Sequence, residues 1–217
     1  MKLFKLIEQL RDAYKDVFEK IKAENERYKE AGEKHEKNKA VYSAKAIRDE
    51  YDNMREEHVN NMNTILKEVK EAVANVRAEY EKEAQAEYQP KGEALNADDV
   101  ALLNSGIVLS SDEVERMAMK YADNITMLRV IENHVKKSDI QVGTETKCMF
   151  LRAGKMLDVS MQAFDAFVKK AKLVVDLMRY NNATNEIFVK CNAKIGQYVE
   201  EYKNNMKTGI MENEDRT

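Results

Sequence analysis

The stretch 3-LFKLIEQLRDAYKDVFEKI-21 decides the fold of the chain. Its apolar residues recur at alternating steps of four and three, the spacing of a heptad seam along one face of an α-helix. Because an isolated helix owes most of its stability to packing, so narrow a seam needs a partner helix from the same chain or from a second subunit. The seam positions are Leu3, Ile7, Leu10, Tyr14, Val17 and Ile21.

A second seam follows after a polar interval at residues 30–39, and Gly32 is the only glycine before Pro90. Two arrangements of this N-terminal segment remain open. In one, the chain turns near residues 32–38 and forms an antiparallel helical hairpin. In the other, a single coiled-coil helix spans roughly 130 Å at 1.5 Å per residue. The hairpin is favoured because one chain can then bury its own seam. The second seam runs through Ile47, Tyr51, Met54, His58, Met62, Ile65, Val69, Ala72, Val76 and Tyr80.

Proline at position 90 and glycine at position 92 mark a boundary after this first segment, residues 1–89. A small three-helix module is predicted at residues 90–139. Asn96 is placed to cap its first helix, Gly106 to end that helix in a left-handed conformation, and the sequence Ser110-Ser-Asp-Glu113 to open the second helix as a capping box.

Long C-terminal helices are predicted at residues 140–208, with a break at residues 181–182 and a disordered tail at residues 209–217. The chain is therefore expected to be all-α, with an N-terminal coiled coil or helical hairpin, a three-helix module and a long helical C-terminal segment. The apolar face of that last segment includes Phe150, Leu157, Phe164, Val168 and Val175.

Charge argues against nucleic acid as the partner. The chain has 36 Lys and Arg against 39 Asp and Glu, for a net charge of −3, and no segment is basic enough to bind a phosphate backbone. The start of the chain gains charge too quickly to form a signal peptide, and no apolar run approaches the ~20 residues of a membrane span. We therefore expect a protein that is neither secreted nor transmembrane and binds no membrane.

Tests for chemistry predict no enzyme, cofactor or metal site. A helical di-metal site needs Glu three residues before His, but Gly32, Arg55 and Ile131 occupy those positions before the three histidines. Both cysteines, Cys148 and Cys191, are assigned to apolar helical stripes, which favours buried, unreactive thiols.

Residues 101–131 carry a resemblance to a known group of proteins. The stretch ALLNSGIVLSSDEVERMAMKYADNITMLRVI contains a Leu-Leu pair, a capping box, Tyr-x-x-Asn and Leu-Arg-x-Ile. With the charged coiled coil before it, this resembles poorly characterised head-assembly proteins of tailed phages and prophages of Gram-positive bacteria. The resemblance covers residues 1–138, and residues 140–217 depart from it. It implies a non-enzymatic role in capsid assembly or the virion.

We therefore expect an oligomerising structural protein of a tailed phage, located in the bacterial host cytoplasm or the virion. Its partners would be further copies of itself and phage proteins such as capsid or portal. The alternative is a phage-encoded inhibitor that docks on a host protein through the acidic three-helix module. The predicted interface consists of Leu3, Ile7, Leu10, Tyr14, Val17, Ile21, Ile47, Tyr51, Met54, Met62, Ile65, Val69, Val76, Phe150, Leu157, Phe164, Val168 and Val175.

Overall fold

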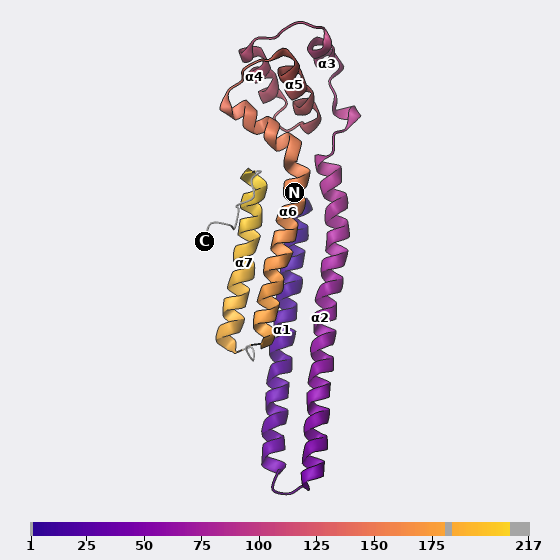
Figure 1. The fold of residues 1–217 in the computed structure, drawn as a ribbon, viewed down its shortest axis with the longest axis vertical. Coiled ribbons are helices and arrows are strands. Elements are labelled where there is room, and N and C mark those ends of the chain that lie inside the picture. The colour runs from indigo at the N-terminus through magenta and orange to yellow at the C-terminus, as the bar shows by residue number, and fades with distance from the viewer. Residues whose placement is uncertain (1, 181–183, 209–217) are drawn as a thin grey trace. The chain divides into compact units, whose positions relative to one another are not determined.

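The computed structural model describes residues 2–180 and 184–208, and it confirms the all-α fold class (Figure 1). Within this part of the chain the regular elements are seven α-helices and one 3-10 helix. The predicted break at residues 181–182 and the tail at 209–217 lie outside the described residues. The chain divides into two compact units, one formed by residues 1–80 and 164–203 and the other by residues 81–163 and 204–217.

The first unit begins with an antiparallel hairpin of α1 (Lys2–Asn38) and α2 (Ala44–Tyr88). Polar contacts between the two helices show the antiparallel register, because Lys20 contacts Glu68 at 2.7 Å and His35 contacts Glu50 at 3.1 Å. The structure thus has the hairpin and not the continuous helix. The turn lies at residues 39–43 and not near residues 32–38, where the sequence predicts it. Helix α1 continues through Gly32, and His35 on the next turn of that helix is buried.

A second antiparallel pair, α6 (Thr144–Tyr180) and α7 (Asn185–Thr208), completes this unit with residues 164–180 and 185–203. Lys170 of α6 contacts Glu201 of α7 at 2.7 Å. Helix α7 runs along α1, since Lys203 lies 3.8 Å from Glu8 and the Lys22 amine lies over the Phe188 ring at the opposite end. The α6–α7 pair therefore covers the first half of α1, and the hairpin extends beyond it toward the 39–43 turn (Figure 1).

An aromatic cluster closes the core of this four-helix unit. The hydroxyls of Tyr80 and Tyr202 are hydrogen-bonded at 2.6 Å, and both side chains are almost completely buried. Phe164 packs against Tyr80 with ring centroids 4.7 Å apart, and Phe4 meets the edge of Tyr202 at 5.9 Å. Residues from all four helices thus meet at one point, where buried tyrosine hydroxyls satisfy each other.

The second unit contains the 3-10 helix η1 (Gly92–Ala94), α3 (Ala97–Asn104), α4 (Ser111–Lys120) and α5 (Ile125–Ser138). The structure confirms the predicted Asn96 cap, the Ser110–Glu113 capping box and the left-handed Gly106, with φ of 81°. Its core extends past residue 139, the end expected for the module, because the start of α6 packs on the short helices. The core consists of Leu103, Leu109, Val114, Ala118, Leu128, Ile131, Val135, Val142, Phe150 and Ala153.

The α1 seam supplies a direct stability test. Leu10 is fully buried within the chain, so Leu10→Ala should lower the free energy of unfolding by about 2–5 kcal/mol through lost apolar contact and a residual cavity. Urea unfolding followed by circular dichroism measures this, with the exposed Gln9→Ala as the matched control. Because the burial is within one chain, the loss should be the same at all protein concentrations. A loss that vanishes on dilution would contradict the intrachain packing.

Candidate functional site

The predicted interface residues of α1 lie inside the first unit. Each of the six N-terminal seam positions is at most 2% exposed, and the same chain covers them. Leu6 and Phe18, which the heptad seam leaves out, are buried as well, so α1 buries a wider stripe than a two-helix seam requires. This burial is complete in a single chain and gives no support for a second subunit at the seam.

The predicted interface residues of α2 differ in burial along the helix. Met62, Ile65 and Val69 are buried, and Val76 is half-buried. Toward the 39–43 turn, Ile47 and Met54 are half-buried and Tyr51 is 45% exposed. This half of the hairpin lies beyond Lys22, whose amine lies over the Phe188 ring in the first turn of α7. The uncovered part of the predicted interface is thus the part near the turn.

The predicted residues of α6 belong to different environments. Phe164 and Val175 are buried in the first unit, and Val168 there is half-buried. Phe150 is buried in the core of the second unit, and Leu157 in that unit is half-buried. The sequence predicts these residues to form one surface, but in the structure they belong to the cores of two separate units.

A buried carboxylate joins the two halves of the hairpin. Glu24 of α1 is only 7% exposed and accepts hydrogen bonds from both Arg27 nitrogens Nε and Nη2, at 2.8 and 2.9 Å. From α2, the Asn61 amide donates to it at 3.2 Å and His58 Nδ1 lies 2.8 Å away. Burial alone raises the pKa of the Glu24 carboxyl, but the hydrogen bonds from Arg27, His58 and Asn61 outweigh it and lower the pKa below its usual value.

The Glu24 cluster predicts a pH-dependent contribution to stability. A lowered folded-state pKa stabilises the chain above the ordinary value of 4.5, and that stabilisation is lost as the pH falls through the folded pKa. Glu24→Gln should lower the free energy of unfolding by roughly 1–3 kcal/mol at pH 7, and by less at pH 3. Urea unfolding at both pH values measures the gap, with the exposed Glu26→Gln as control. An equal gap at pH 7 and pH 3 would disprove the assignment.

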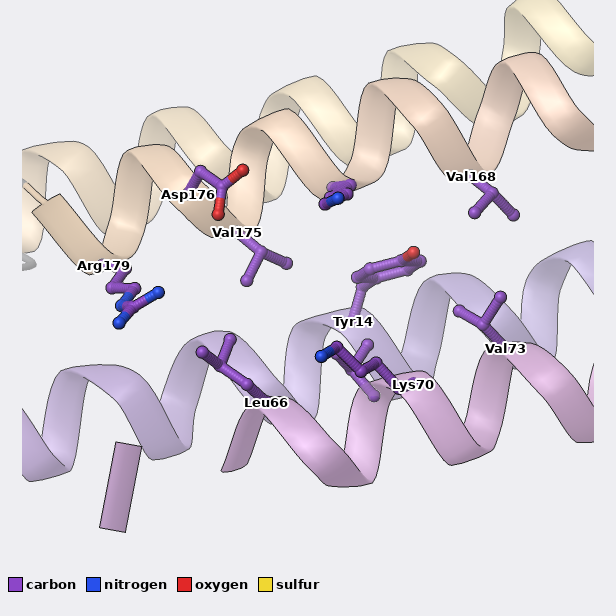
Figure 2. Close-up of a pocket in the computed structure, with 10 residues that line it drawn as sticks. Tyr14, Leu66, Lys70, Val73, Val168, Val175, Asp176 and Arg179 are labelled. Atoms are coloured by element: carbon purple, nitrogen blue, oxygen red, sulfur yellow. The ribbon is translucent and has the colours of Figure 1, made fainter. Parts of the chain in front are cut away.

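An apolar groove opens on the first unit between α2 and α6, with α1 as its floor (Figure 2). It has a volume of about 350 Å³, at the lower end of the ~300–1,000 Å³ of ligand-binding pockets. Val168 and Val175 face Leu66 and Val73 across it, and the buried Tyr14 lies between them. The remaining lining residues are Val69, Lys70, Lys172, Asp176 and Arg179.

The rim of this groove is basic. Lys70, Lys172 and Arg179 border it against a single carboxylate, Asp176. Over residues 2–180 and 184–208, none of these three cations forms an ion pair with a carboxylate. Farther along the same two helices the situation differs, because Arg77 of α2 pairs with Asp165 of α6 at 2.6 Å. The groove is thus an apolar surface with a net positive charge at its edge.

The second unit presents a surface of the opposite kind. The loop between α3 and α4, residues 105–110 and hereafter the module loop, exposes Ile107 by 56% and Val108 by 70%. Residues 95–115 around it contain five Asp or Glu and no Lys or Arg. Asp98 and Asp112, on the first turns of α3 and α4, are exposed. Asp99 pairs with Lys120 of α4 at 2.7 Å, so one of these charges is compensated. Two apolar side chains thus project from a surface that is acidic on balance.

Within residues 2–180 and 184–208, no three His, Cys, Asp or Glu side chains lie close enough together to hold a metal ion. Cys191 is buried with its Sγ 3.9 Å from the Val174 carbonyl oxygen, and burial raises the pKa of its thiol. The expected burial of Cys148 is wrong, because it lies on the face of α6 opposite the buried Thr146 and Phe150.

Comparisons with known proteins found no match. No family model matches this chain, and neither a curated protein nor a solved structure is similar to it. The helices among the described residues also include none with the length and apolarity needed to cross a bilayer.

The two cysteines should react at different rates. In the folded chain one equivalent of a disulfide reagent such as DTNB should react quickly with the exposed Cys148, while Cys191 should react only after unfolding. The absorbance of the released thiolate, followed with and without urea, measures both phases. Cys148→Ser should remove the fast phase alone. Two fast equivalents in the native protein would contradict the burial of Cys191.

Proposed function

We propose that this chain is a non-enzymatic structural protein of a tailed phage that acts in head assembly or as a virion component, in a scaffold-like manner. It would work through contacts between its helices and other proteins, in the host cytoplasm during assembly or within the virion. Its partners would be capsid or portal proteins and further copies of the chain. The resemblance of residues 1–138 to head-assembly proteins is one support for this proposal.

The observation that carries the proposal is the module loop on its acidic surface. Ile107 and Val108 stand out from a module whose neighbouring residues Leu103 and Leu109 are buried. Exposed apolar side chains rimmed by polar residues are typical of protein-binding surfaces. This loop also lies inside the stretch 101–131, the part of the chain that carries the resemblance. The features that suggest phage assembly thus coincide with an uncovered surface.

A second candidate function uses the same surface. A phage-encoded inhibitor could dock on a host protein through the acidic module, because five carboxylates and no cation at residues 95–115 favour a basic partner site. The alternative differs from the first proposal in the identity of the partner and not in the surface. The partner that binds the chain in cells therefore decides between them.

Affinity purification from phage-producing bacteria tests the two functions. A tagged chain, expressed with the phage head genes, should bring down capsid or portal protein in a fixed ratio, and mass spectrometry of purified particles should detect it. The matched control carries Ile107→Ser and Val108→Ser, which should reduce recovery of the partner. One stoichiometric host protein in place of the phage proteins would favour the inhibitor and overturn the structural role.

A further inference from the structure

We infer that the module loop of one copy binds in the groove of a second copy. This inference deepens the proposed function, on which it rests, because it names the chain itself as the partner of the groove. Both surfaces belong to the described residues, and each lies within one compact unit.

The module loop is held in shape before any partner arrives. Leu103, just before the loop, and Leu109, within it, are anchored in the core of the module. Within the loop, the Ser105 hydroxyl donates to the Leu102 carbonyl oxygen at 2.7 Å and accepts from the Ile107 backbone N–H at 3.3 Å. Gly106 adopts the left-handed conformation that the turn requires. A rigid loop loses little conformational entropy on binding, which favours association.

The groove offers matching chemistry. Its walls are valine and leucine side chains. On binding, the exposed Ile107 and Val108 of another copy would therefore move from water into contact with an apolar surface. The volume of about 350 Å³ is small enough to be filled by a few side chains and does not require a whole helix. The floor is preformed, because Tyr14 is only 2% exposed in the single chain.

Charge favours this occupant over others. The groove rim carries Lys70, Lys172 and Arg179 against Asp176, and the loop lies in a segment with carboxylates and no cations. Opposite potentials of this kind speed encounter and set the orientation of the two partners. Two identical surfaces would instead face each other with like charge, groove against groove or loop against loop. The charges thus favour a contact between unlike surfaces.

A contact between two different patches of the same chain is heterologous. Each copy then offers one loop and one groove, so contacts can repeat from copy to copy and form a ring or an open chain. Association of this kind should grow with protein concentration and weaken as salt screens the charges. It would give an assembly protein a way to polymerise through the surfaces that its own fold leaves uncovered.

Two variants that disable opposite sides of the contact test the inference. The loop variant carries Ile107→Ser and Val108→Ser, and the groove variant carries Lys70→Glu and Lys172→Glu. The matched controls change similarly exposed residues elsewhere: Leu173→Ser with Val189→Ser for the loop variant, and Lys29→Glu with Lys34→Glu, near the 39–43 turn, for the groove variant. Circular dichroism is used to check that the two test variants and the two control variants remain folded. Sedimentation and light scattering then give the molar mass.

The wild type and both controls should form species of at least twice the 25.1 kDa chain mass, while each test variant should associate roughly tenfold or more weakly. Mixing the two test variants should restore a dimer, because one still has its groove and the other its loop. Any of three results would overturn the inference: a monomeric wild type, unchanged association of the variants, or a mixture that stays monomeric. Recovery of capsid or portal protein by a monomeric wild type would still leave the proposed function standing.

Discussion

Burial of the α1 seam is the constraint on which the rest of the first unit depends. Leu3, Ile7 and Leu10 are buried together with Leu6 and Phe18, so the apolar stripe of α1 is wider than one partner helix covers. The α6–α7 pair supplies the remaining cover, and the Tyr80–Tyr202 hydrogen bond joins the layers at one end. Beyond the end of α7, the described helices leave the hairpin without this cover. There, polar contacts around Glu24 join α1 to α2 in place of apolar packing.

Much of this architecture could be predicted from the sequence. Heptad spacing located the α1 seam, and the Ser110–Glu113 capping box located the start of α4, because both signals depend on neighbouring residues alone. The identity of the covering helices could not be predicted, since Tyr202 lies 122 residues from Tyr80. The same limit applies to Phe150 and Phe164, which share one helical stripe and lie in different units.

The groove between α2 and α6 could not be predicted from the sequence, for a different reason. Val168 and Val175 stood out as apolar, but the opening depends on how far α2 and α6 stand apart, which no local pattern specifies. Its charge was hidden as well, because net charge per segment averages over all faces of a helix. Lys70 and Lys172, 102 residues apart in sequence, become neighbours only when α2 and α6 flank the same opening.

The division of the first unit into residues 1–80 and 164–203 has a consequence for synthesis on the ribosome. The N-terminal hairpin emerges first, but the helices that complete its core are translated only after residues 81–163. At roughly 5–20 residues per second, the apolar side of α1 spends several seconds without its cover. The intervening unit is contiguous apart from residues 204–217, so most of it can fold during that wait. The earliest helix of the chain thus depends for its burial on the last.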